Sequence, residues 1–177
     1  AFADLNDVMD LAEDFIRSVT EEVHAQCGED MDFFNKWIDK GVVDRVAETM
    51  AKPFARMTYT EAMQICANSG RKFDYPTAWG EAMQTEHERF IAEEHVGGPV
   101  FITDYPTDQK AFYMKLNADG KTVAAMDVLA PGIGEIIGGA QREERLDVLD
   151  RRLDEMGLAK EDYWWYRDCL LYTSDAA

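Results

Sequence analysis

The fold is decided by residues 122–145, TVAAMDVLAPGIGEIIGGAQREER, in which two apolar runs flank a Pro-Gly turn. The first run, Thr122 to Leu129, has the composition of a strand, and turn residues lie before and after it. The second run, Pro131 to Gly139, has the pattern of a further extended segment with glycines at both ends. Together they predict neighbouring strands of an antiparallel sheet.

Two more strands are expected upstream. Val100 to Thr103 has the composition of a buried strand that ends at Tyr105-Pro106, and Ala111 to Leu116 has that of a second strand. Asn117 to Gly120 supplies a turn into the run that begins at Thr122. The sheet part of the chain is therefore expected over about residues 99–145.

The part before the sheet, about residues 1–98, is predicted to be mainly helical. Apolar residues recur at steps of three and four from Leu5 to Gly28, which indicates a helix with one buried stripe. A second helix is expected from about Asp32 to Met50, weakened at Gly41. The residues expected to face inward on these two helices are Val8, Ala12, Phe15, Val19, Val23, Phe34, Trp37, Ile38, Val42 and Val46.

Capping boxes predict two shorter helices. One begins at Thr58-Tyr59-Thr60-Glu61 and runs to Gly70, and the other begins at Thr85-Glu86-His87-Glu88 and ends before Gly97.

A last helix over about residues 142–156 is indicated by the spacing of its leucines, and Trp164-Trp165 is expected in the core. Its inward residues are Leu146, Leu149, Leu153 and Met156. The order of helices, antiparallel sheet and helix predicts an α+β domain.

The composition limits the partners. Among 177 residues, Lys and Arg number 18 and Asp and Glu 35, so the net charge of −17 disfavours general attraction to nucleic acid or anionic lipid. No apolar run is long enough for a membrane helix, so no membrane contact is expected. The three cysteines are odd in number and far apart, which fits no disulfide framework and favours a cytoplasmic location.

Asp127 and Glu135 place carboxylates inside apolar strand sequence, where an unpaired charge is costly. Something cationic should compensate them. Carboxylates on neighbouring strands can hold Mg²⁺ carried by a nucleoside triphosphate, because this ion prefers oxygen ligands and keeps substrate phosphates in its shell. The alternative is an ion pair with Arg142 or Lys115. The nearby glycines have neither the Rossmann nor the P-loop spacing.

Arg142 follows these glycines directly, and their missing side chains leave room beside its guanidinium. The planar guanidinium of an arginine can donate hydrogen bonds to a carboxylate or to an amide oxygen. The alternative is that Arg142 to Arg145 form the solvated first turn of the last helix. His87 and His95 lie eight residues apart, too far along one helix to share a metal comfortably.

Several ordered blocks resemble one family. They are FDYP at 73–76 with Trp79-Gly80, QTEHER at 84–89, FITDYP at 101–106, KAFYMKLN at 110–117 and the segment from Gly132 to Arg145. In this order they resemble the asparaginyl-tRNA synthetases, a branch of the class II synthetases, from Ala1 to about Tyr166. The resemblance implies part of an antiparallel class II catalytic sheet flanked by helices. It also implies ATP and Mg²⁺, asparagine and tRNA(Asn) as substrates, and a homodimer in the complete enzyme.

The same resemblance implies roles for five residues. Glu135 falls at the acidic position that holds Mg²⁺ and ATP, and Asp127 is similar to the strand aspartate that supports this metal site. Arg142 matches the arginine that grips the substrate side chain. Gly138 lies where relatives place a small residue that faces metal or substrate, and Tyr113 lies on the strand that lines this pocket. Glu135 and Arg142 are therefore the candidate catalytic residues.

The resemblance covers part of the family pattern. The anticodon-binding barrel, the dimer motif and the motif 2 loop would precede Ala1, and the motif 3 arginine would follow Tyr166. Residues 167–177 instead form a tail that departs from the family, so we expect an incomplete or frame-disrupted reading frame whose product is inactive alone. Two alternatives remain open: an ammonia-dependent, asparagine-forming paralogue, and a non-catalytic interaction module of the same fold.

Overall fold

The computed structural model describes residues 3–174, and the side chains of residues 3–169. Its helices and strands follow in the order α1 (Leu5–Gln26), α2 (Gly28–Trp37), α3 (Val42–Met50), β1 (Ala55–Thr58), α4 (Tyr59–Asn68), α5 (Thr85–Arg89), η1 (Phe90–Val96), β2 (Val100–Pro106), η2 (Thr107–Gln109), β3 (Thr122–Ala130), β4 (Gly134–Ala140), α6 (Leu146–Glu155), η3 (Lys160–Tyr163) and α7 (Trp164–Ser174). η1 is a π-helix that continues α5.

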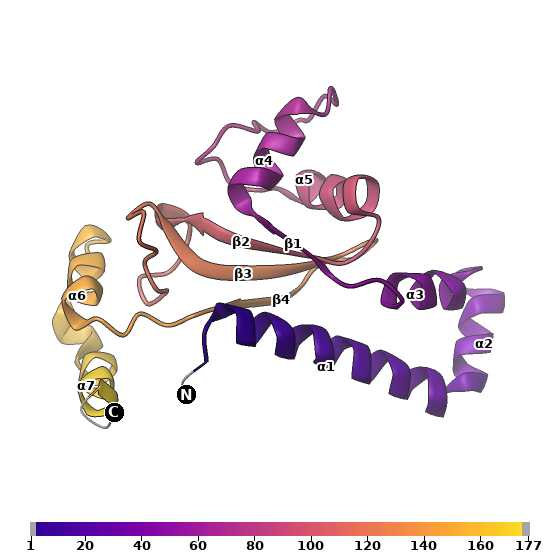
Figure 1. Ribbon diagram of the computed structural model, residues 1–177, viewed down its shortest axis with the longest axis horizontal. Coiled ribbons are helices and arrows are strands. Elements are labelled where there is room, and N and C mark those ends of the chain that lie inside the picture. The colour runs from indigo at the N-terminus through magenta and orange to yellow at the C-terminus, as the bar shows by residue number, and fades with distance from the viewer. Residues whose placement is uncertain (1–2, 175–177) are drawn as a thin grey trace.

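A four-stranded sheet in the order β1-β2-β3-β4 forms the centre of the fold. Strands β2, β3 and β4 are antiparallel, whereas β1 pairs with β2 in parallel. Helices α4 and α5 lie on one side of the sheet and α1 on the other, with α6 and α7 beyond one end (Figure 1). The predicted α+β class, an antiparallel sheet flanked by helices, is confirmed, with one parallel edge strand added.

The two faces of the sheet are buried against different helices, because successive side chains of a strand point to opposite sides. Ile102 and Ala125 pack with residues of α4 and η1 on what we call the α4 face. Phe101 and Met126 pack with residues of α1 on the α1 face. A third cluster joins α6, η3 and α7 to Phe112.

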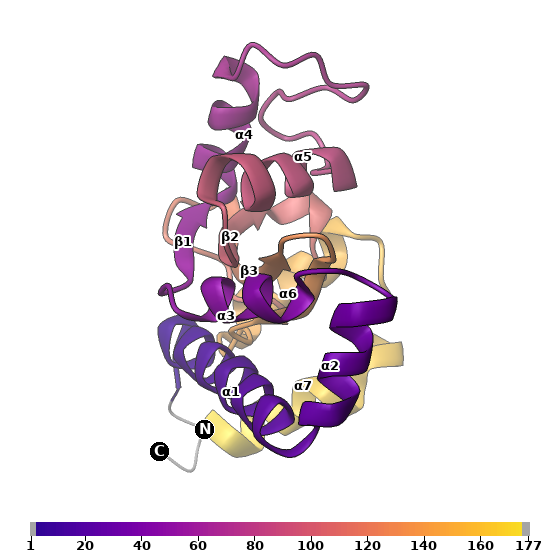
Figure 2. The ribbon, with the colours of Figure 1, turned by 90° about the vertical axis from the view of Figure 1, so that its right-hand side faces the viewer.

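Helix α1 extends past the sheet, and α2 and α3 follow its far end to form a helical lobe (Figure 2). Met9 and Ala12 are buried, but Phe15 is 60% exposed and Trp37 is 67% exposed. The inward orientation predicted from the spacing is therefore wrong for Phe15, Val19, Val23, Phe34, Trp37 and Ile38. Periodicity shows that a helix is amphipathic, but it does not show that a partner covers the apolar face.

The second expected helix is broken in two. Gly41 adopts a left-handed conformation with φ of 83° and serves as the N-cap of α3. This conformation cannot continue a right-handed helix, and glycine adopts it at little cost. The weakness predicted at Gly41 is thus a complete break between α2 and α3.

The strand predictions were partly wrong. Strand β1 was missed because its four residues run directly into α4, whose capping box of Thr58 and Glu61 is confirmed. Within the described chain, Ala111 to Leu116 forms only isolated bridges, Met114 to Arg142 and Leu116 to Val123. This segment is a loop that crosses the end of the sheet.

The N-terminus of α5 differs from the prediction by one residue. Gln84 rather than Thr85 is the N-cap, and its backbone N–H donates to Nδ1 of His87 over 3.2 Å. His87 is fully buried, so the residue three positions after the cap is an interior histidine rather than Glu88.

The end of the chain also differs. The last predicted helix begins at Leu146 rather than at residue 142, and Met156 is 45% exposed. Trp164 and Trp165 are 61% and 57% exposed, so their expected place in the core is wrong. Residues 167–174 continue α7, and residues 175–177 of the expected tail lie outside the described residues. No helix within residues 3–174 is long and apolar enough to cross a membrane.

Candidate active site

A bulge in β4 decides which face Glu135 occupies. Val128 pairs with Ile137 and Leu129 with Glu135, so Ile136 is an extra residue in the ladder. Because an extra residue reverses the alternation of side chains, Glu135 shares a face with Gly138 instead of opposing it. Its partner Leu129 packs in the α4-face cluster, whereas Ile137 packs on the α1 face.

Asp127 lies directly opposite Gly138 in the neighbouring strand, on the same α4 face. A Cβ placed on Gly138 would lie 2.7 Å from Oε1 of Glu135 and 3.4 Å from Oδ1 of Asp127. Gly138 therefore provides the floor between the two carboxylates, and a larger residue would displace Glu135. The sequence prediction that these three residues form one site agrees with this geometry.

The cation that compensates Asp127 is Lys110. Its Nζ lies 2.8 Å from Oδ2 of Asp127, and the two side chains are 20% and 13% exposed. The alternative expectation of an ion pair with Arg142 or Lys115 is wrong, because Lys115 pairs with Glu144 and Arg142 stacks on a ring. Nothing in the spacing pointed to Lys110, which lies 17 residues from its partner.

Glu88 of α5 adds a third carboxylate to this region. Its Oε2 lies 3.7 Å from the position of a Cβ on Gly134. Burial, together with the negative charges of Glu135 and Asp127, raises the pKa of Glu88. Burial is the larger cause, and the smaller contribution from Glu135 and Asp127 shows that the three carboxylates lie near one another.

Glu135 and Asp127 fit a magnesium ion that arrives with a nucleotide. Mg²⁺ is usually bound by one or two carboxylates, with waters and substrate phosphates completing its shell. Within residues 3–174, no group of three or more Asp, Glu, His or Cys is close enough to hold a metal by itself. The donor set therefore suits a metal held jointly with substrate phosphates better than a permanently bound ion.

Arg142 lies on the same face at the other end of the site. Arg142 lies an even number of positions from Gly138, so extended chain places both residues on the same face. Its bridge partner Met114 also packs against the α4-face cluster. Four residues of strand separate it from Gly138, about 13 Å. Its guanidinium carbon lies over the Tyr113 ring, 4.7 Å from the centroid, and the Arg142 side chain is exposed. The structure thus brings Tyr113 next to Arg142, although Tyr113 lies in a loop and not on the strand that the resemblance implied.

Glu143 is fully buried, so the alternative interpretation of Arg142 to Arg145 as a solvated helical turn is wrong for this residue. Its carboxylate accepts hydrogen bonds from the backbone of Leu116 over 2.9 Å and from Nε and Nη2 of Arg145 over 2.8 Å each. Burial tends to raise the pKa of Glu143, but the bonds from Arg145 and Leu116 outweigh it and lower the pKa. Glu143 thus fastens the loop that carries Tyr113 to the strand that carries Arg142.

Replacing Glu143 by Gln is expected to destabilise the chain by about 3 kcal/mol at neutral pH, because buried donors lose a charged acceptor. A lowered pKa in the folded state means that this stabilisation is present above the ordinary value of 4.5 and is lost as the pH falls through the lowered value. Urea unfolding between pH 3 and pH 7 should therefore show the difference between the wild type and Glu143→Gln shrinking in acid. An equal change for Glu144→Gln, an exposed neighbour, would contradict the assignment.

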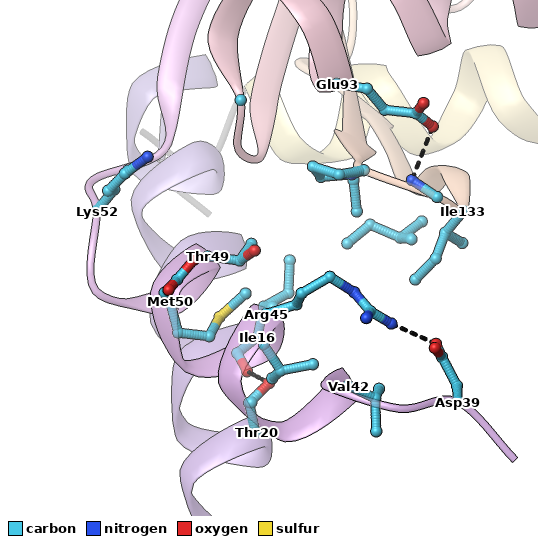
Figure 3. A pocket seen from close by; sticks show the side chains of 17 residues that line it. Ile16, Thr20, Asp39, Val42, Arg45, Thr49, Met50, Lys52, Glu93 and Ile133 are labelled. Atoms are coloured by element: carbon cyan, nitrogen blue, oxygen red, sulfur yellow. Dashed lines mark hydrogen bonds and ion pairs between the residues drawn. The ribbon is translucent and has the colours of Figure 1, made fainter. Parts of the chain in front are cut away.

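A cavity of about 660 Å³ lies elsewhere, between α1, α3 and the β3–β4 turn (Figure 3). Apolar residues such as Ile16, Val46 and Ile133 line it, and Arg45 points to Asp39 at its edge. Its lining includes none of the five predicted site residues. The candidate site on the α4 face is therefore separate from this cavity.

The family described as tRNA synthetases class II (D, K and N) matches residues 1–175. The chain belongs to this class II synthetase family. The asparagine–tRNA ligase of Clostridium beijerinckii is 55% identical over 172 residues, and that of Shewanella sediminis is 58% identical over 172 residues. In each case the match covers 97% of this chain and 37% of the relative. This class II synthetase chain thus spans less than two fifths of the length of these relatives.

Solved structures agree with this membership. Asparaginyl-tRNA synthetase from Pyrococcus horikoshii matches with a TM-score of 0.82 at 33% identity, over 97% of this chain and 39% of that one. The same enzyme complexed with asparaginyl-adenylate also matches with a TM-score of 0.82. The sequence-based resemblance to the asparaginyl branch of the class II synthetases is confirmed.

Proposed function

We propose that this chain is the central part of the catalytic domain of an asparagine–tRNA ligase. The complete enzyme would activate asparagine with ATP and transfer it to tRNA(Asn), as a cytoplasmic homodimer. The observation that carries the proposal is the bulge at Ile136, which brings Glu135 onto the face that already holds Asp127, Gly138 and Arg142. The names of the bacterial relatives support asparagine as the amino acid.

Each site residue then has a role that its surroundings favour. Arg142, whose guanidinium lies over the Tyr113 ring, binds the side-chain amide oxygen of asparagine through its N–H donors. Glu135 and Asp127 face the phosphates of ATP and supply oxygen ligands to Mg²⁺. When bound, Mg²⁺ neutralises charge on those phosphates. Gly138 leaves the floor between them open.

Most of the rate enhancement would come from positioning. The asparagine carboxylate must be held in line with the α-phosphate of ATP. Binding both asparagine and ATP to one rigid sheet removes much of the entropic barrier to their reaction. Charge that develops on the α-phosphate is then stabilised by groups already in place. Fixed strands β3 and β4 serve this purpose better than mobile loops would.

The proposal is tested by thermal denaturation with ligands, because a specific ligand stabilises the state that binds it. We expect the full-length protein containing this segment to gain stability with asparagine and Mg²⁺-ATP together, and to gain much less when aspartate replaces asparagine. Thermal stabilisation by aspartate, together with ammonia-dependent formation of asparagine, would instead indicate the asparagine-forming paralogue. No gain with any of these ligands would indicate a non-catalytic module and overturn the proposal.

A further inference from the structure

Lys110 is a largely buried lysine with two defined contacts. Its Nζ lies 2.8 Å from Oδ2 of Asp127 and 3.9 Å from the centroid of the Tyr105 ring. The Tyr105 ring is itself buried. The Tyr105 ring and the Asp127 carboxylate therefore both contact the Lys110 ammonium, and together they define its position.

The contact with Lys110 makes the two oxygens of Asp127 different. Oδ2 is taken by the lysine, whereas Oδ1 lies 3.4 Å from the position of a Cβ on Gly138. Oε1 of Glu135 lies 2.7 Å from the same position, so the two oxygens are within about 6 Å of each other. Rotation of the Asp127 carboxylate would break the bond from Lys110, so this bond restrains where Oδ1 points, together with the hydrogen bond between Asp127 and the Tyr105 side chain.

Charge compensation alone does not account for this geometry. The negative charges of Asp127 and Glu135 both act on Glu88 in this region. Any nearby cation would reduce this repulsion, yet the lysine bonds directly to Oδ2 of Asp127, whereas Oδ1 is the oxygen nearer to Gly138. The arrangement matches the way outer hydrogen-bond partners orient the carboxylate ligands of metal sites.

We propose that Lys110 is a positioning residue that holds the Asp127 carboxylate with Oδ1 directed across Gly138 toward Glu135. The inference rests on the proposed function of this site, in which both oxygens face Mg²⁺ and the ATP phosphates. Lys110 itself contacts neither ligand and acts through Asp127.

The first test is the orientation of Asp127 in crystals of this chain. In the wild type, Oδ2 should bond to Lys110 and Oδ1 should face Gly138. In Lys110→Met, which keeps the aliphatic length and removes the donor, the carboxylate should rotate away from that position. An unchanged Asp127 in the variant would overturn the proposal. Lys110→Gln, with a shorter polar side chain, serves the same test if Lys110→Met does not fold.

The second test uses Mn²⁺ alone as a probe, with binding measured by calorimetry and by paramagnetic broadening of amides in β3 and β4. Loss of an orienting partner should weaken Mn²⁺ binding by about tenfold or more. Loss of a nearby positive charge without an orienting role should instead tighten binding, since it removes repulsion. Tighter or equal binding by Lys110→Met would therefore contradict the proposal.

Lys115→Met is the matched control, because Lys115 pairs with Glu144 over 2.7 Å at a more exposed position. We expect it to leave both Mn²⁺ affinity and the Asp127 orientation unchanged. If the wild-type chain binds no Mn²⁺, the metal assignment of the proposed function fails. The orientation of Asp127 in the Lys110→Met crystal then still decides for or against the role of Lys110.

Discussion

Glu135→Ala is expected to lower asparagine-dependent ATP–pyrophosphate exchange by about 10³-fold in the full-length protein that contains this segment, if it has the proposed ligase activity. The reason is that Glu135 supplies a carboxylate oxygen on the face shared by Asp127 and Gly138, next to the expected phosphates. Its side chain is exposed and lies at an edge strand, so the fold should survive the change. Exchange of labelled pyrophosphate into ATP measures the effect directly.

Glu144→Ala is the control for this variant, because Glu144 is 64% exposed and its bond to Lys115 lies outside the site. It should retain nearly full exchange activity. A loss in Glu144→Ala as large as that in Glu135→Ala would point to general charge effects. Retention of activity by Glu135→Ala would remove Glu135 from the site.

Arg142→Ala should raise the KM for asparagine by about 100-fold, because the substrate amide loses a charged and geometrically matched donor. The KM for ATP should change little, since the nucleotide is expected at the other end of the site. The Tyr113 ring contacts the guanidinium of Arg142 and helps to orient it. Tyr113→Leu should therefore raise the KM for asparagine as well, but by a smaller factor. Steady-state kinetics with each substrate varied separately distinguishes these effects.

Arg151→Ala provides the comparison, because Arg151 is an exposed arginine of α6 whose carboxylate partner lies 3.8 Å away. It should leave both KM values unchanged. An unaltered asparagine affinity in Arg142→Ala would show that Arg142 does not bind the side chain, and the assignment of the substrate pocket would have to move.

The strands and the site carboxylates could be predicted because they leave strong local signals. β2, β3 and β4 are short apolar runs bounded by turn residues, and they appear where the sequence predicts them. Asp127 and Glu135 stand out as charges within such runs, which is costly unless a cation is near. The family blocks added the roles of Arg142, Gly138 and Tyr113, which composition alone could not give.

The bulge at Ile136 could not be predicted from the alternation of residues. Glu135 and Arg142 are seven positions apart, an odd number, so regular pairing would place their side chains on opposite faces. The extra residue changes this, because Ile136 and Ile137 then both avoid the α4 face, where Leu129 and Glu135 pair. A bulge depends on how two strands pair, so the sequence of either strand alone does not predict it.

The supporting residues were missed for a related reason. Lys110, Glu143 and Glu88 act through partners that are distant in sequence, such as Asp127 for Lys110 and Leu116 for Glu143. Charged residues in loops and helix ends usually face solvent, so their pattern predicts exposure. Burial of Glu143 follows only once the loop from Ala111 to Leu116 crosses the end of the sheet.

The most direct test is a crystal structure of the full-length protein that contains this segment, with Mg²⁺ and a non-hydrolysable asparaginyl-adenylate analogue. We expect the analogue to lie on the α4 face, with its side-chain amide bonded to Arg142 and its phosphate near Glu135 and Asp127. A structure in which Glu135 and Arg142 lie on opposite faces of β4, or in which the analogue contacts neither, would contradict the assignment.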